Sequence, residues 1–189
     1  QASIGGERFV CLITNGKDAK HTNELLNGKL DFLTNLLQRT LKAPIHCTGA
    51  GLHTNAKVSM ALLPAPPDTG IVFRRTDLGA NAEIKAHCDN VIDSRLCTTI
   101  GDGNGVSIGT VEHLMAAFAG CGVDNAFVEV SGAEIPIMDG SARPFVFLLE
   151  CAGIVEQNAP RKAIRILKRI TVGNDACWAT IMPSDRFSM

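Results

Sequence analysis

Alternation of apolar and polar residues predicts short strands from Thr40 onward. Val58, Met60 and Leu62 alternate with small or polar residues, which is typical of a half-buried strand. A cluster of glycines at 101–105 is typical of a turn or small loop. Further strands are expected over 71–73, 96–100 and the strongly apolar segment 125–130, and a strand with a connection over 82–92.

Two segments have the pattern of helices. The segment 111–121 is the clearer one, with Thr110 or Ser107 as its N-cap and Gly120 or Gly122 as its stop. A second helix is predicted over 142–152. Strands followed by a helix, another strand and another helix indicate an α/β fold built as an α+β two-layer sandwich.

The two ends of the chain differ from this central part. Leucines recur at roughly helical spacing over 21–37, either in a short amphipathic helix packed on the domain or in upstream sequence with no native role. The segment 163–182 predicts a hairpin around the turn 173–175, and its first strand is expected to have one basic, solvated face. Because a lone hairpin is marginally stable, we expect it to belong to a larger sheet. We therefore divide the chain into an unassigned N-terminal extension (1–37), a first domain (38–158) and the start of a truncated second domain (159–189).

Composition narrows the class of protein. Apolar residues make up 46% of the chain and charged residues 20%, which is ordinary for a packed globular domain. The formal net charge of −1 argues against a general nucleic-acid binder. No apolar run approaches the roughly 20 residues that span a bilayer, and the first residues do not have the pattern of a signal peptide. Six of the seven cysteines stand singly among apolar or small neighbours, so we expect reduced core thiols and a cytoplasmic location.

Glu112 and His113, at the start of the first predicted helix, are the candidate catalytic pair. Adjacent helical residues diverge by about 100° and no histidine follows at the needed spacing, so the two cannot begin a one-face HExxH zinc site. At an open helix N-terminus His113 can instead bind a metal while Glu112 reaches the metal-bound water. The ordinary alternative is that Glu112 complements the helix dipole and His113 is a partly buried, satisfied side chain. Spacing alone leaves both interpretations open.

Several longer motifs point to one family. The stretch TVEHLMAAFAGCGVDN, followed by EIPIMDGSARPF, resembles the UDP-3-O-acyl-N-acetylglucosamine deacetylases of lipid A synthesis. Upstream, QRTLKAPIHCTGAGLHTNAKV, PPDTGIVFRRTDL and SRLCTTI resemble the same family in the same order. The resemblance runs from Gln38 to Met189 and does not include residues 1–37.

This resemblance implies an activity and a cofactor. Enzymes of the family have two domains of similar layered fold with Zn²⁺ and substrate between them, and they use water to hydrolyse the acetamide of UDP-3-O-acyl-N-acetylglucosamine. By this likeness His113 is a zinc ligand and Glu112 is the general base. The other two ligands come from an HKxxD helix of the second domain, and a later histidine stabilises the oxyanion or protonates the leaving amine.

The chain carries one part of that machinery. Its five histidines do not include one in an HKxxD sequence: His21, His46, His53, His87 and His113. One ligand cannot hold a catalytic zinc at useful affinity, so we expect this chain, without the missing second domain, to be inactive alone.

The resemblance also suggests roles for four further residues. Leu96 and Cys97 are expected to line the site near the glucosamine of the substrate, or else to end a core strand. His53, in GLHT, is expected either to face the cleft or to bond to backbone in a turn. Asp139 is expected either to orient groups around the metal or to form a turn before the second helix.

Two competing functions remain open on the sequence. One is a non-catalytic module that holds a nucleotide sugar or a partner protein. The other is an unrelated metal hydrolase that a partner chain completes. Binding of a UDP-sugar that a chelator does not affect would favour the first, and activity regained on mixing with a second domain would favour the other.

Overall fold

The computed structural model describes residues 37–79, 82–162, 164 and 166–184. The helix predicted over 21–37 lies outside these residues except for Leu37, which begins a strand. Leu37–Arg161 forms one compact unit, and the described residues after Arg161 belong to a second unit. The two units are described separately below.

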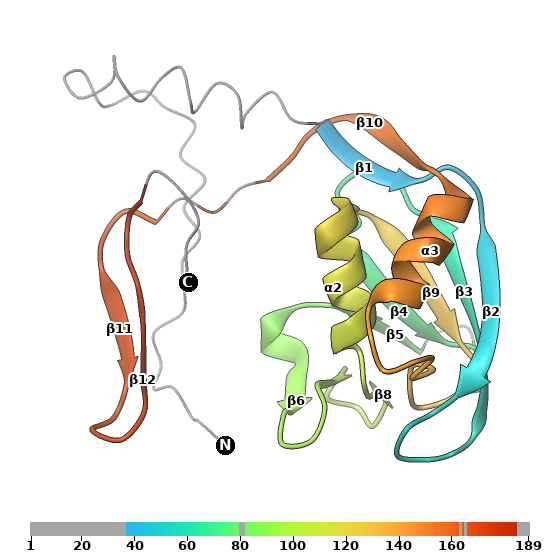
Figure 1. The fold of residues 1–189 in the computed structure, drawn as a ribbon, viewed down its shortest axis with the longest axis horizontal. Helices are drawn as coiled ribbons and strands as arrows, with labels where there is room; N and C mark the ends of the chain where they lie inside the picture. The colour runs from blue at the N-terminus through green and yellow to red at the C-terminus, as the bar shows by residue number, and fades with distance from the viewer. Residues whose placement is uncertain (1–36, 80–81, 163, 165, 185–189) are drawn as a thin grey trace. The chain divides into compact units, whose positions relative to one another are not determined.

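A five-stranded mixed sheet forms one layer of the Leu37–Arg161 unit (Figure 1). Its strands lie in the order β2-β3-β9-β4-β5, and every neighbouring pair is antiparallel except β4 and β9. The strands are β2 (Ile45–Ala50), β3 (Lys57–Pro64), β4 (Ile71–Arg75), β5 (Glu83–Lys85) and β9 (Ala126–Val130).

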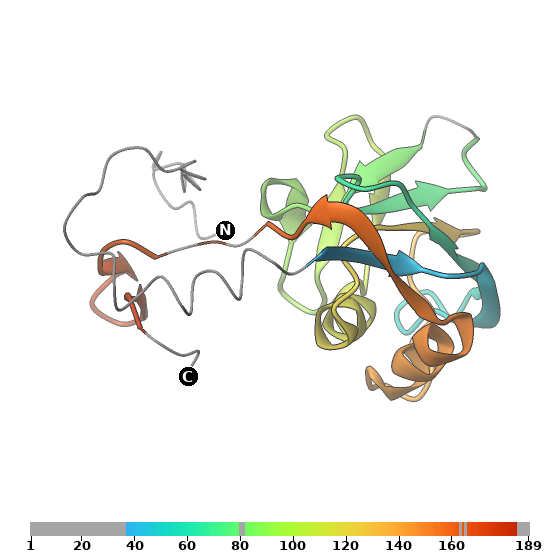
Figure 2. The same cartoon turned by 90° about the horizontal axis from the view of Figure 1, so that it is seen from above.

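Two helices cover one face of this sheet. α2 (Glu112–Cys121) and α3 (Arg143–Ala152) pack against each other on the same side of the strands (Figures 1 and 2). Phe118 and Phe145 of the helices are fully buried, as are Phe73 and Val128 of the sheet. Because alternate residues of a strand point to opposite faces, the alternation predicted for β3 places its apolar side chains in this core, and the apolar strand predicted over 125–130 is β9, in which alternate residues are buried. The predicted α+β two-layer fold is confirmed.

A small three-stranded sheet directly precedes α2 in the sequence. It consists of β6 (Val91–Asp93), β7 (Thr99–Gly101) and β8 (Ser107–Ile108), and a 3-10 turn, η1 (Cys88–Asn90), precedes it. The strand predicted over 96–100 is wrong in its first three residues, since β7 begins at Thr99. Asp93 accepts a hydrogen bond from the backbone N–H of Arg95 at 3.1 Å, and this local turn competes with an extended backbone.

The predicted cap at the start of α2 is also wrong. Val111 occupies the N-cap position without a side-chain hydrogen bond, and Ser107 lies in β8. The Thr110 hydroxyl is bonded instead to Glu134. The stop at Gly122 is confirmed, because this residue takes the left-handed conformation that glycine favours, with φ of 67°.

A two-stranded ribbon contacts the far end of α2. It pairs β1 (Leu37–Leu41) with β10 (Ile154–Pro160) in antiparallel fashion. The Arg39 guanidinium donates to the Cys121 carbonyl at 3.2 Å, and Arg161 donates to the Gly122 carbonyl. Cations are favourable at a helix C-terminus, so these contacts stabilise both the helix and the docking of the ribbon.

The second unit contains a hairpin among its described residues. β11 (Ile170–Gly173) and β12 (Trp178–Ile181) pair antiparallel, so the predicted hairpin is confirmed. The Asn174 side chain closes the turn by accepting hydrogen bonds from the backbone N–H groups of Ala176 and Cys177. The first strand is shorter than predicted, since the described residues of the segment 164–169 do not belong to a strand.

The expectation of core cysteines is wrong for three of the six, whereas Cys47 and Cys121 pack against the edge of the core. Cys88, Cys151 and Cys177 are exposed, and Cys47, Cys97 and Cys121 are half-buried. All six are free thiols, and small or apolar neighbours in the sequence did not distinguish the exposed ones from those that pack against the core. Within the described part of the chain, neither helix is long and apolar enough to cross a membrane.

Candidate functional site

The start of α2 is held against the residue that precedes β7. The backbone N–H of Val111 donates to the Thr98 carbonyl at 3.3 Å, and the backbone N–H of Thr98 donates to Oε2 of Glu112 at 3.0 Å. Glu112 is half-buried. These reciprocal bonds fix one oxygen of the Glu112 carboxylate and orient the first helical turn.

His113 is the next residue of this turn and is half-buried. Its side chain diverges from that of Glu112 by about 100° around the helix. Among the described residues, the structure records no hydrogen bond to the His113 ring, so a ring nitrogen remains available as a ligand atom.

A hollow of about 470 Å³ brings together three of the predicted substrate residues. His53, Leu96 and Cys97 line it, together with Asp93 and Arg95. Leu96 is 86% exposed, so the alternative of a core strand end does not hold for it. Glu112, His113 and Asp139 do not line the hollow, but Thr98, which bonds Glu112, directly follows Cys97 in the chain.

Asp93 and Arg95 are wall residues of this hollow that sequence reasoning missed. The Arg95 guanidinium bonds the Asp93 carboxylate through both oxygens, with the shortest contact at 2.8 Å. This hydrogen-bonded guanidinium holds the pKa of Asp93 well below its usual range. The hollow therefore carries a fixed ion pair beside the apolar Leu96, and the only sequence signal was the i, i+2 spacing of two opposite charges.

The buried carboxylate of Glu134 joins the His53 loop to the start of α2. Its oxygens accept hydrogen bonds from the backbone N–H of His53 at 3.0 Å, and from the backbone N–H and hydroxyl of Thr54 at 3.1 and 2.9 Å. The Thr110 hydroxyl donates to the same carboxylate at 3.0 Å. Burial raises the pKa of Glu134, but these hydrogen bonds more than offset that effect and lower it. The sequence signal that could have identified Glu134 is its position as an acidic residue within the otherwise apolar stretch 133–137.

The backbone around Glu134 explains two unusual residues. Gly109 and Glu134 form a parallel bridge, which places Thr110 beside the carboxylate. Thr110 has φ of 59°, a left-handed conformation that is rare for a β-branched residue. A Cβ at Gly51 would overlap the Glu134 carboxylate and the Thr54 hydroxyl, so this loop requires glycine.

Asp139 forms local contacts within the loop that precedes α3. Its Oδ1 accepts hydrogen bonds from the backbone N–H and the hydroxyl of Ser141, at 2.9 and 2.8 Å. The Ser141 hydroxyl in turn accepts from the backbone N–H of Arg143. These are the contacts of a turn, and none of them joins Asp139 to Glu112 or His113.

Comparison with known proteins gives a family and several relatives. The sequence model of the family described as LpxC, UDP-3-O-acyl N-acetylglycosamine deacetylase, matches residues 38–189. A protein named UDP-3-O-acyl-N-acetylglucosamine deacetylase from Thioalkalivibrio sulfidiphilus is 59% identical over 152 residues, which are 80% of this chain and 50% of that protein. Proteins of the same name from Alcanivorax borkumensis and Chromobacterium violaceum are 57% and 51% identical, over 80% and 82% of this chain and 50% and 51% of their own length. The chain spans about half the length of the curated relatives it matches.

Proposed function

This chain belongs to the LpxC family of UDP-3-O-acyl N-acetylglycosamine deacetylases, and from that membership we propose that it forms part of a zinc-dependent deacetylase. The proposed substrate is UDP-3-O-acyl-N-acetylglucosamine, whose acetamide is hydrolysed by water in the cytoplasm during lipid A biosynthesis. Residues 38–158 are proposed as the first domain and 159–189 as the start of the second.

The observation that carries this proposal is the hydrogen bond between Thr98 and Glu112. It fixes Oε2 of the carboxylate at 3.0 Å from the Thr98 nitrogen and leaves Oε1 to accept a proton from the attacking water. Thr98 follows two residues that line the hollow, Leu96 and Cys97. The base is therefore hydrogen-bonded to the residue that directly follows the proposed sugar-binding wall, to which His53 also contributes.

Zinc, when bound, supplies a Lewis acid that polarises the amide carbonyl and makes water more acidic. A catalytic zinc has three protein ligands, and His113 supplies an imidazole for one position. In the described part of the chain His113 does not belong to a group of three close metal-binding side chains, so these residues alone do not fit the ion. We place the other two ligands, a histidine and an aspartate, in the half of the relatives' length that this chain does not span, and we expect the chain alone to be inactive.

A chimaera tests the proposal. Residues 38–189 of this chain would replace the matching half of the Thioalkalivibrio sulfidiphilus relative, and acetate release from the UDP-sugar would be measured. We expect activity in the chimaera, a loss of about 10²- to 10⁴-fold with Glu112→Gln at unchanged zinc content, and a loss of bound zinc with His113→Ala. Cys151→Ser, at an exposed position of α3, serves as the control and should have no effect.

Each part of the proposal can fail separately. Full activity of the Glu112→Gln chimaera would remove Glu112 as the base. Chelator-sensitive turnover by the chain alone would show that it needs no further ligands. Saturable, chelator-insensitive binding of the UDP-sugar by a folded but inactive chimaera would favour the non-catalytic module.

A further inference from the structure

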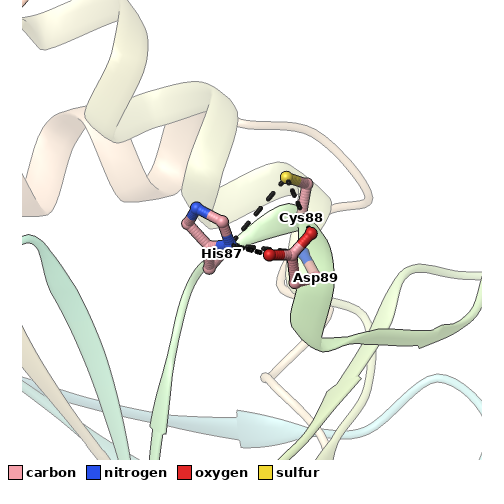
Figure 3. A group of neighbouring side chains, drawn as sticks. All are labelled: His87, Cys88 and Asp89. Carbon is pink, nitrogen blue, oxygen red and sulfur yellow. Dashed lines mark hydrogen bonds and ion pairs between the residues drawn. The ribbon is translucent and has the colours of Figure 1, made fainter. Parts of the chain in front are cut away.

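Three consecutive side chains of metal-binding type lie together at the start of η1, between β5 and β6. They are His87, Cys88 and Asp89 (Figure 3). All three are exposed, and none of them lines the hollow described above. They are also the one group of three or more close histidine, cysteine or acidic side chains in the part of the chain that the structure describes.

The distances between their ligand atoms resemble those of a metal site. His87 Nδ1 lies 3.4 Å from Asp89 Oδ2 and 3.9 Å from Cys88 Sγ, and Cys88 Sγ lies 3.8 Å from Asp89 Oδ1. Zinc bonds of about 2.0 Å to nitrogen or oxygen and about 2.3 Å to sulfur, at tetrahedral angles, place ligand atoms about 3.3 to 3.6 Å apart. These distances involve both oxygens of Asp89; with one ligand atom taken from each residue, the three atoms all lie within 4.8 Å of one another, so small side-chain rotations bring them to the separations of a tetrahedral site.

We propose that His87, Cys88 and Asp89 bind a transition-metal cation of the zinc class, with water in the fourth position. A thiolate and an imidazole favour Zn²⁺ or Co²⁺ over Mg²⁺ and Ca²⁺, which prefer ligand sets made of oxygen atoms. This site is separate from the one proposed at His113 and does not depend on the proposed deacetylase function.

Binding changes two local contacts. His87 Nδ1 now accepts a hydrogen bond from the backbone N–H of Asp89 at 3.3 Å, and the metal takes over that lone pair. The Cys88 thiol loses its proton to become a ligand. Because exposed side chains lack a protein shell that orients them, the affinity is expected to be lower than that of a buried structural zinc site. The bound ion links the N-cap residue of η1 to its first two residues and stabilises the segment between β5 and β6.

Cobalt titration of the full chain tests the site, because a thiolate bound to Co²⁺ gives an intense charge-transfer absorption and an imidazole at His113 does not. We expect this absorption in the unmodified chain and its loss in Cys88→Ser. Added Zn²⁺ should displace the cobalt. Mutation of residues that only orient a metal ligand lowers metal affinity about 10- to 100-fold. Because His87→Gln and Asp89→Asn each change a proposed ligand itself, they should lower the affinity at least that much. Cys151→Ser is the matched control, since its thiol is also exposed in the same unit.

Two results would overturn the proposal. One is the absence of a thiolate-to-cobalt absorption in the unmodified chain. The other is an absorption that survives in Cys88→Ser, because the thiolate that binds cobalt would then belong to a different cysteine. This holds whatever the result for Cys97→Ser. Thermal unfolding gives an independent measurement: Zn²⁺ should raise the midpoint of the unmodified chain and of Cys151→Ser but leave that of Cys88→Ser unchanged.

Discussion

The Thr110 hydroxyl donates a hydrogen bond of 3.0 Å to Oε1 of Glu134, 24 residues further along the chain. Both residues are buried. Left-handed backbone at a β-branched residue such as Thr110 costs about 1–3 kcal/mol and persists only where surrounding contacts enforce it. Because Glu112 and His113 follow within three residues, this contact fixes the direction in which the candidate catalytic turn begins.

Glu134→Gln is expected to destabilise the Leu37–Arg161 unit. The substituted amide keeps one acceptor oxygen and replaces the other with an NH₂ group, so either the Thr110 hydroxyl or the Thr54 N–H, which bind different oxygens, faces a donor in place of its acceptor. An unsatisfied buried polar group costs about 1–3 kcal/mol, so the free energy of unfolding should fall by that amount in urea denaturation.

Glu129→Gln is the matched control for this substitution. Glu129 is half-buried, and its recorded ion pair with Arg74 is long, at 3.8 Å. Its loss should change the free energy of unfolding by less than about 0.5 kcal/mol. Equal losses in the free energy of unfolding for the two substitutions would show that the buried hydrogen bonds of Glu134 do not contribute more to stability than the long ion pair of Glu129.

The stability of the unit should depend on pH through Glu134. Its pKa in the folded chain is lowered from the ordinary value of 4.5, so the unfolded state binds the proton more readily. The contribution of Glu134 is therefore fully present above about pH 4.5 and is lost as the pH falls through the folded pKa. Urea denaturation between neutral and acidic pH should show a steeper decline for the unmodified chain than for Glu134→Gln, and parallel curves would contradict the assignment.

Thr110 offers a second test of the same contact. Thr110→Val keeps the shape and the β-branch but removes the hydroxyl, which leaves Glu134 without one of its donors. We expect a loss of about 1–3 kcal/mol in the free energy of unfolding. Thr110→Ser keeps the hydroxyl and should stay within about 0.5 kcal/mol of the unmodified chain. In a double-mutant cycle with Glu134→Gln, additive losses would mean that the two residues do not interact.

Two Arg–Asp pairs of equal length should differ in their contribution to stability. Arg161 and Asp124 lie 2.8 Å apart with 26% of each side chain exposed, whereas Arg95 and Asp93 lie 2.8 Å apart with 85% and 40% exposed. Arg161 also donates to the Gly122 carbonyl at the end of α2. Arg161→Ala should therefore lower the free energy of unfolding by about 1–3 kcal/mol, and Arg95→Ala by less than about 1 kcal/mol. Urea unfolding of both variants measures the two losses, and an equal or smaller loss for Arg161→Ala would show that its pairing at the end of α2 is unimportant.

The parts of the fold that the sequence predicted depend on local pattern. Val58, Met60 and Leu62 alternate with small or polar residues because β3 has one face in the core. Gly122 ends α2 because a left-handed conformation there favours glycine over other residues. In both cases the structure depends on residues only a few positions apart, so it can be predicted from a single sequence.

The parts that failed depend on contacts between distant residues. The Thr110 hydroxyl was expected to cap α2, but Glu134 accepts its hydrogen bond after a chain reversal that no local pattern indicates. Leu96 was placed in a strand because its apolar side chain fits one, whereas the Asp93–Arg95 contact bends the backbone there. The roles proposed for Glu112 and His113 came from the family resemblance and stay predictions.

The pairing of β1 with β10 has a mechanical consequence. Leu37 lies opposite Pro160, so the backbone enters and leaves the compact unit side by side, about 5 Å apart between paired antiparallel residues. Tension applied to these two points acts across the hydrogen bonds of the ribbon and separates them one pair at a time, beginning at Leu37 and Pro160. The ribbon therefore separates before the five-stranded sheet is loaded. Pulling on the flanking chain leaves the geometry around Glu134 unchanged until the ribbon has opened.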